Sequence, residues 1–162
     1  FAAAAPVMAT FLDDIARACG NGVQIPMIII HGDADPIVPY DTNRVFAGPG
    51  MTLDVLSVPD TVAFWAMQNG CIPEPVIEEL PDTHPSDGTA AVRETYLDEN
   101  GLPKVVHINV RQGGHTWPGG AEPLPEFIVG KQSQDFDASA MIWDFFALHS
   151  REIAPEKQEN LP

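Results

Sequence analysis

Residues 25–35 read Ile25-Pro26-Met27-Ile28-Ile29-Ile30-His31-Gly32-Asp33-Ala34-Asp35. The first part is an unbroken apolar run, which is typical of a parallel strand covered on both faces. We therefore predict a central strand over residues 25–31. Because acidic side chains follow directly, groups capable of chemistry stand at the carboxyl end of this strand.

A second apolar run ends in a comparable way. Residues 104–110 predict a strand, and after it comes Gly113-Gly114-His115-Thr116-Trp117-Pro118-Gly119-Gly120. Ligands of open α/β sheets bind beyond the carboxyl ends of the strands. We therefore expect the two polar segments to lie on the same rim of one sheet.

The rest of the chain predicts further strands and helices. Strands are expected over residues 1–10, 76–80 and 90–97, and helices over 11–19, 59–69 and 137–149, with another helix beginning in 41–46. The expected N-caps are Asp41 or Thr42 for one helix and Asp60 for another. Strands that alternate with helices predict an α/β fold, a mostly parallel sheet flanked by helices. Residues 76–110 form an inserted β-meander within it.

Composition limits the class of protein. The 162 residues are 44% hydrophobic and 19% charged, which fits one globular domain. We assign residues 1–150 to that domain and residues 151–162 to a flexible tail. The formal net charge of −15 argues against nucleic acid and anionic membrane surfaces as partners. No run reaches the roughly 18 apolar residues that a membrane span needs.

The two cysteines, Cys19 and Cys71, leave three interpretations open. They are separate small buried residues, or one disulfide of an exported protein, or, least in keeping with their surroundings, a nucleophile. No metal is predicted, since His31, Asp33 and Asp35 have no recognised ligand spacing. Glycine-rich dinucleotide and phosphate motifs are absent from the sequence, so no cofactor is predicted.

Asp35 is the candidate catalytic acid. In a catalytic triad the carboxylate orients the imidazole and stabilises its cation. Pro36 restricts the backbone of Asp35 to extended conformations, which helps to fix its side chain. Asp33 is the rival and Asp41 a distant third. The alternative is that Asp33 and Asp35 only shape a turn.

His115 is the candidate general base. The two glycines before it allow the backbone to turn sharply beneath the ring. Trp117 and Pro118 are placed to wall a pocket, and Trp117 is the candidate substrate-binding residue. The alternative is an ordinary, partly buried histidine. His31 is expected to be a structural histidine that bonds neighbouring backbone, and the other histidines have no catalytic context: His84, His107 and His149.

The nucleophile is missing from this pattern. No stretch reads Gly-x-Ser-x-Gly, the strained turn that presents a catalytic serine. None of the serines has the required glycine frame: Ser57, Ser86, Ser133, Ser139 and Ser150. We assign no nucleophile among them.

At these residues the chain resembles a known family. Segments 1–7, 30–40, 113–119 and 135–146 are similar to the C-terminal part of the polyhydroxybutyrate depolymerase-like esterases, which are close to the feruloyl and acetylxylan esterases of carbohydrate esterase family one. The resemblance implies the C-terminal portion of an α/β-hydrolase fold. In that fold the chain order is nucleophile, acid, histidine.

The resemblance also implies a function. It implies ester hydrolysis by a Ser-His-Asp triad, with Asp35 as acid, His115 as base and a small or polymeric ester as substrate. The serine elbow and oxyanion loop would precede Phe1, so an upstream segment of the same protein is the expected partner. A secreted or periplasmic enzyme, often disulfide-linked, is implied. The alternatives are a non-catalytic binding or regulatory lobe on the same scaffold and a metal-dependent hydrolase.

Overall fold

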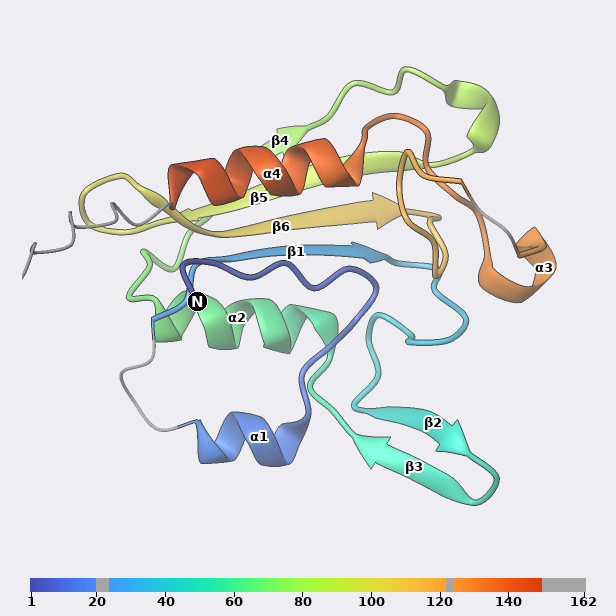
Figure 1. Cartoon of the computed structure of the whole chain (residues 1–162), viewed down its shortest axis with the longest axis horizontal. Coiled ribbons are helices and arrows are strands. Elements are labelled where there is room, and N and C mark those ends of the chain that lie inside the picture. Colours follow the sequence, from blue (N-terminus) through green and yellow to red (C-terminus); the bar gives the residue numbers. More distant parts are fainter. Residues whose placement is uncertain (20–23, 122–123, 150–162) are drawn as a thin grey trace, which may run out of the picture.

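A four-stranded sheet with helices on both faces forms the centre of the computed structural model, which describes residues 1–19, 24–121 and 124–149 (Figure 1). The strands lie in the order β1-β6-β5-β4. Their bounds are Met27–Gly32 for β1, Pro103–Arg111 for β6, Ala90–Leu97 for β5 and Val76–Glu79 for β4. The fold is therefore a mixed α/β arrangement, and the predicted central strand is confirmed as β1.

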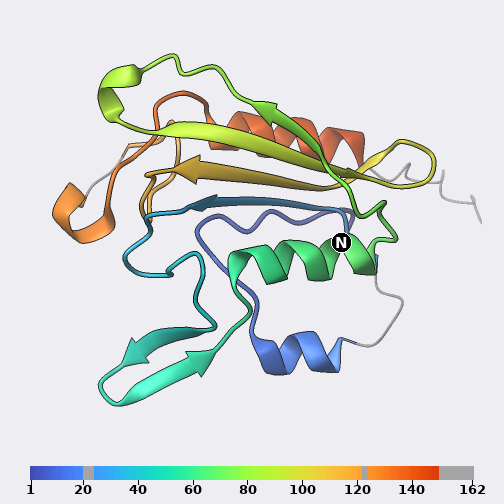
Figure 2. The same ribbon diagram turned by 180° about the vertical axis from the view of Figure 1, so that it is seen from behind.

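The alternating side chains of β1 serve two different layers. Helix α4 (Ala138–Leu148) covers one face of the sheet and α2 (Val58–Gln68) covers the other (Figures 1 and 2). Ile28 and Ile30 pack on the α4 side, whereas Met27 and Ile29 pack on the α2 side. Because both faces are covered, every residue of β1 is buried, as its continuous apolar run predicts.

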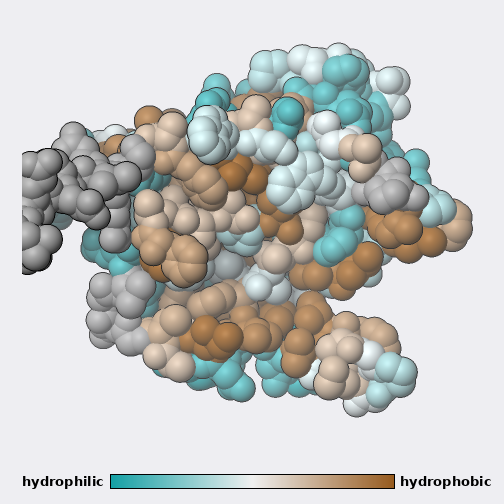
Figure 3. Space-filling model, viewed as in Figure 1, coloured by the Kyte–Doolittle hydropathy of each residue, from teal (hydrophilic) through white to brown (hydrophobic). Residues whose placement is uncertain are grey.

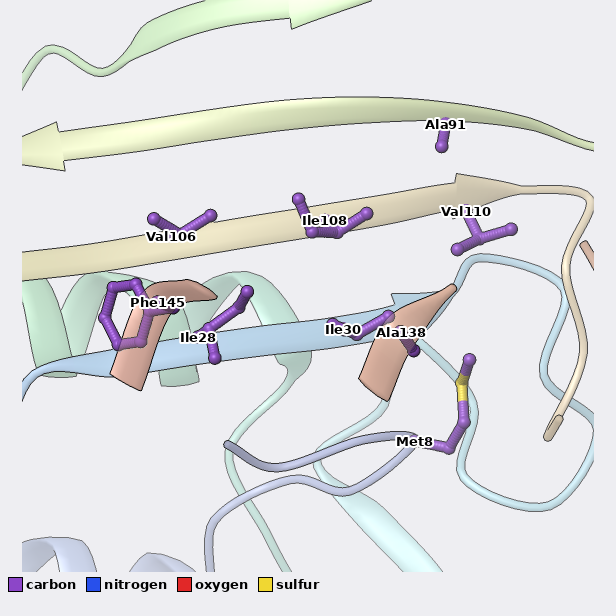
Figure 4. Packing of buried hydrophobic residues seen from close by; sticks show 9 residues of the cluster. All are labelled: Met8, Ile28, Ile30, Ala91, Val106, Ile108, Val110, Ala138 and Phe145. Carbon is purple, nitrogen blue, oxygen red and sulfur yellow. The ribbon is translucent and has the colours of Figure 1, made fainter. Parts of the chain in front are cut away.

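The α4 side of the sheet holds the larger apolar cluster. Phe145 lies beside β1 and Ala138 beside its far end (Figure 4). The other buried members are Met8, Ile28, Ile30, Ala91, Val106, Ile108 and Val110. This cluster joins the N-terminal segment, three strands and the last described helix into one core.

The sheet is mixed rather than mostly parallel. Strands β1 and β6 pair in parallel, but β5 pairs antiparallel with both β6 and β4. The predicted β-meander is thus confirmed, and it contributes most of the antiparallel character. Near the N-terminus, parallel bridges Ala4–Met27 and Val7–Ile30 place an extended segment beside β1.

The helix predicted to begin in residues 41–46 is wrong. The chain there forms a separate hairpin of β2 (Arg44–Gly48) and β3 (Met51–Asp54). Gly48 and Gly50 have φ of 140° and 74°, so the backbone reverses where a helix would have to continue. The backbone conformations of these two glycines therefore decide the local structure, rather than the capping pattern at Asp41 and Thr42.

Helix boundaries follow the sequence closely, with one different cap. The N-cap of α2 is Ser57, whose side chain accepts a hydrogen bond from the Asp60 backbone N–H at 3.1 Å. Asp60 is instead the third helical residue, and the Ser57 hydroxyl donates to its carboxylate at 2.7 Å. Both bonds join the same two residues, so the Ser57 hydroxyl caps the helix and is itself held by the Asp60 carboxylate.

The remaining elements are short. Helix α1 spans Asp13–Ala18, α3 spans Glu126–Val129, and a single 3₁₀ turn, η1, spans Pro85–Asp87. No described helix is long and apolar enough to span a membrane. The predicted tail, residues 151–162, lies outside the described residues.

The two aromatic residues of α4 predict a contrast in stability. Phe145 is 4% exposed and Trp143 is 73% exposed. Phe145→Ala is expected to lower the free energy of unfolding by about 3–5 kcal/mol, because it leaves a cavity against β1. Trp143→Ala is the matched control, with an expected change within about 0.5 kcal/mol. Urea unfolding of both variants measures the difference, and equal losses would contradict this assignment of the helix face.

Candidate active site

The parallel pairing of β1 with β6 brings the two polar segments together. The register pairs His31 with Asn109 and Gly32 with Val110, so both strands end at the same edge. Both arrowheads point to the same end of the sheet in Figure 1. The loops that follow these strands therefore start side by side, although about 80 residues separate them in sequence.

Hydrogen bonds join the two loops at their base. The Asp33 N–H donates to Val110 O at 3.1 Å and the Ala34 N–H donates to Gly113 O at 3.0 Å. In return, the Gln112 N–H donates to Asp33 Oδ1 at 2.6 Å. The carboxylate of Asp33, the rival acid, is thus engaged in holding the loops together.

Glycines permit this close approach. A Cβ atom on Gly32 would lie 2.3 Å from Gly113 O, and one on Gly114 would lie 2.0 Å from Val129 O. Neither Gly113 nor Gly114 has a left-handed φ. The chain turns tightly here as expected, since the Gly113 N–H donates to Val110 O and the Thr116 N–H donates to Gly114 O. Glycine is needed because neighbouring atoms leave no space for a side chain.

Asp35 lies at the centre of the joined loops and is 4% exposed. Its Oδ1 accepts hydrogen bonds from the backbone N–H groups of Ile37 at 2.7 Å and Val38 at 2.9 Å. Its Oδ2 lies 2.9 Å from His115 Nδ1 and 3.4 Å from His31 Nε2. The candidate acid and the candidate base are therefore in direct contact.

The contact sets the tautomer of His115. An ionised carboxylate only accepts hydrogen bonds, so His115 Nδ1 carries the hydrogen and donates the hydrogen bond to Asp35 Oδ2. In the neutral ring, Nε2 is then the unprotonated nitrogen. The side chain is 33% exposed, and no hydrogen-bond partner of Nε2 occurs among the described residues. Nε2 of His115 is therefore available to accept a proton from an incoming group.

Opposing effects act on the Asp35 carboxyl. Burial raises its pKa, but hydrogen bonds from His31, from the backbone of Val38 and Ile37, and from His115 outweigh burial. The net result is a pKa below the ordinary value for aspartate. Asp35 is therefore ionised when His115 is protonated, as a residue that stabilises an imidazolium must be.

Trp117 and Pro118 are placed differently from each other. Trp117 is 43% exposed, and its Nε1–H donates to Ser139 Oγ at 3.2 Å in the first turn of α4. Pro118 is fully buried and its carbonyl accepts from the Ala138 N–H, so it packs beneath α4 rather than walling an open pocket. Only Trp117 remains available to a ligand.

Three of the described serines have structural partners, and Ser86 lies exposed in η1. Ser57 caps α2, Ser133 is fully buried beside Asp135, and Ser139 accepts from Trp117. Within the described ranges, no serine hydroxyl bonds to His115. Ser150 lies outside those ranges. The described structure thus contains an acid–base pair and offers it no serine.

Neither a disulfide nor a metal site is found among the described cysteines and metal-binding side chains. Cys19 and Cys71 are both free, so they do not form a disulfide with each other. Among residues 1–19, 24–121 and 124–149, no group of three His, Cys, Asp or Glu side chains is arranged to hold a metal ion.

Sequence reasoning missed a row of polar side chains on the α2 face of the sheet. Tyr40 lies between two imidazoles, with ring centroids 6.0 Å from His31 and 5.9 Å from His107. His107 Nδ1 in turn lies 3.1 Å from Glu94 Oε2. The sequence did contain a signal for this row. His31 and His107 both occupy odd-numbered positions on neighbouring strands, and the strand register places such positions on the same face of the sheet.

The pair of Asp35 and His115 can accept and release one proton. Such a pair activates a hydroxyl nucleophile or a water molecule when either is placed against the free imidazole nitrogen. Among residues 1–19, 24–121 and 124–149, we assign no oxyanion-stabilising group.

Comparison with known proteins adds one relative. The chain is 32% identical over 127 residues to a protein named "Putative esterase NocK" from Nocardia uniformis subsp. tsuyamanensis. The match covers 75% of this chain and 37% of that protein, so the chain spans little more than a third of the relative's length. No protein-family model matches the chain.

Close backbone packing at Gly32 predicts a sensitive position. Gly32→Ala is expected to destabilise the protein by about 3 kcal/mol, because the added Cβ would overlap the Gly113 carbonyl. It should also weaken the Asp35–His115 hydrogen bond, measured as loss of the downfield Nδ1–H proton resonance. The control is Gly101→Ala, at a φ of 78° with nothing near its Cβ, which should cost about 1 kcal/mol and leave the resonance unchanged. An unchanged resonance in Gly32→Ala would refute the packing argument.

The low pKa of Asp35 predicts a pH dependence of stability. A carboxyl group whose pKa is lower in the folded chain stabilises the fold above its unfolded pKa, about 3.9, and that stabilisation is lost as pH falls through the folded pKa. Asp35→Asn should therefore be much less stable than wild type at pH 7, with the difference shrinking below about pH 4. Urea unfolding across pH 3–7 measures it. The exposed Asp41→Asn serves as control, and a gap that widens toward low pH would contradict the assignment.

Proposed function

We propose that this chain supplies the acid and the base of a serine esterase, a carboxylic ester hydrolase with a Ser-His-Asp triad. One observation carries the proposal: the 2.9 Å contact between His115 Nδ1 and Asp35 Oδ2. It joins loops at the carboxyl ends of two adjacent parallel strands, where ligands bind in α/β sheets. Asp35 is the acid and His115 the base.

The comparison supports ester hydrolysis in general. The relative is named as an esterase, and its similarity to this chain covers 75% of the 162 residues. The match covers 37% of that protein's length, and the hydrolase order of nucleophile, acid and histidine puts the serine before Asp35. We therefore propose that residues 1–150 are the C-terminal portion of an α/β-hydrolase domain. A polyhydroxybutyrate depolymerase or feruloyl esterase type is our finer proposal, taken from the motifs around Asp35 and His115.

The serine would come from an upstream segment of the same protein. His115 Nε2 takes the serine proton as the serine oxygen attacks the ester carbonyl carbon, and it then gives that proton to the departing alcohol. In the second half, Nε2 takes a proton from water as the water oxygen attacks the acyl carbon, and returns it to the serine. Asp35 holds the Nδ1–H tautomer and stabilises the cation throughout.

The surroundings of the pair favour an uncharged, apolar ester. Apolar surface flanks a notch at the end of the molecule where these loops emerge, between α3 and the β2–β3 hairpin (Figure 3). Phe127 in α3 is 88% exposed and Phe46 in β2 is 72% exposed. The net charge of −15 works against polyanionic substrates. We propose Trp117 as a further contact to the acyl or alcohol part, and a secreted or periplasmic location where polymeric esters are met.

Turnover of a short p-nitrophenyl ester tests the proposal. In the full-length encoded protein, Asp35→Asn and His115→Ala should each lower turnover by about a thousandfold or more, since each removes a triad member. The 162-residue chain alone should show no measurable turnover, because its sequence has no Gly-x-Ser-x-Gly elbow.

Two controls make this test specific. Asp33→Asn lies in the same loop but contacts the Gln112 backbone instead of His115, and should lose less than about tenfold. His84→Ala, at an exposed site, should behave as wild type. Full turnover by the isolated chain, or a loss below tenfold in His115→Ala, would contradict the triad. A full-length protein without any esterase activity would favour the non-catalytic lobe.

A further inference from the structure

We infer that His31 is a positioning residue for the catalytic acid: its Nε2–H, shared between the Val38 carbonyl and Asp35 Oδ2, fixes the Asp35 carboxylate toward His115. The inference deepens the proposed function and rests on it for its kinetic consequence. It goes beyond the sequence prediction that His31 only bonds neighbouring backbone, a bond the structure confirms.

The hydrogen-bond geometry determines which nitrogen donates. His31 Nε2 lies 2.8 Å from Val38 O, and a carbonyl oxygen only accepts, so Nε2 carries the hydrogen. The same nitrogen lies 3.4 Å from Asp35 Oδ2. One N–H group therefore links both ends of the turn over residues 35–38.

The imidazole has its polar contacts on this turn alone among the described residues. His31 is 0% exposed, and its Nδ1 has no hydrogen-bond partner in the described structure. A buried imidazole costs free energy that another isoleucine, like those at positions 28–30, would avoid. The contacts that offset this cost all lead to the turn that holds the acid.

The two oxygens of Asp35 have different partners. Oδ1 accepts from the backbone N–H groups of Ile37 and Val38, which fix one side of the carboxylate. Oδ2 accepts from His115 and faces His31. Two imidazoles therefore approach Oδ2: the partly exposed ring of His115 and the fully buried ring of His31. Because His31 is on β1, the orientation of Oδ2 is tied to the central strand.

This placement also affects charge. The contact of His31 Nε2–H with Oδ2, at 3.4 Å, is the largest of the effects that lower the pKa of Asp35 against the opposing effect of burial. A carboxylate that resists protonation leaves the proton on His115 when the imidazolium forms. His31 therefore acts on the reaction through Asp35, without touching substrate.

His107 provides a matched control on the same face of the sheet. It is 1% exposed, pairs in register with Ile29, and bonds Glu94 and Tyr40 rather than Asp35. Replacing it should cost stability in the same way as replacing His31. A role in positioning the acid is not expected for it.

The test measures the Asp35 titration by carbon NMR of the side-chain carboxyl in the 162-residue chain, with assignment from Asp35→Asn. His31→Phe should raise the pKa of Asp35, because it removes one donor. His31→Gln, whose amide nitrogen can reach the position of Nε2, should keep it near wild type. His107→Phe should leave it unchanged. If His31→Phe does not fold, His31→Asn, whose amide is too short to reach Asp35, should show the same rise.

Kinetics of the full-length protein supply the second readout. His31→Phe should lower kcat by about ten- to a hundredfold with KM unchanged, since only the orientation of the acid is lost. An Asp35 titration identical to wild type in His31→Phe and His31→Asn, or an equal shift in His107→Phe, would overturn the inference. Absence of esterase activity in the wild-type full-length protein would instead refute the proposed function. The NMR titration would still decide whether His31 lowers the pKa of the Asp35 carboxyl.

Discussion

The parallel pairing of β1 with β6 is the constraint on which the site depends. The register from Met27–Val105 to Gly32–Val110 makes both strands end together, so Asp35 and His115 meet although they lie far apart in sequence. Helices α4 and α2 cover the two faces of β1, which is the environment that its continuous apolar run predicts. A shift of one residue would reverse the faces and separate the loops.

Backbone-to-backbone contact then fixes the site more tightly than side-chain packing alone. Gly32, Gly113 and Gly114 let the two loops and the segment after α3 approach to distances that no side chain would permit. Asp33 completes this base by accepting from the Gln112 N–H. Above it, Asp35 is buried with its charge stabilised by four neighbouring groups, two of them backbone. The acid is thus held by elements of the central sheet rather than by a free loop.

Much of the fold was predictable, for physical reasons visible in particular residues. The apolar run over residues 25–31 correctly predicted the buried strand β1. The helix predicted over residues 59–69 is α2, and Gly70, in a left-handed conformation, follows its end. The hairpin at residues 44–54 was missed because a capping pattern near Asp41 matched a helix start, while the glycines at 48 and 50 reverse the chain. The pairing of β2 with β3 is a local hairpin that depends on these glycines, and a helix-capping rule does not take them into account.

The sequence by itself determined the residue types of the site: an acidic loop after one buried strand and a glycine-framed histidine after another. It left Asp33 and Asp35 as rivals, because both follow the same strand and spacing alone treats them alike. The tertiary structure decided between them, since the turn aims Asp35 at His115 while Asp33 meets a backbone N–H. Which side chain meets which partner depends on strand register and loop packing, and these are set by contacts between residues distant in sequence.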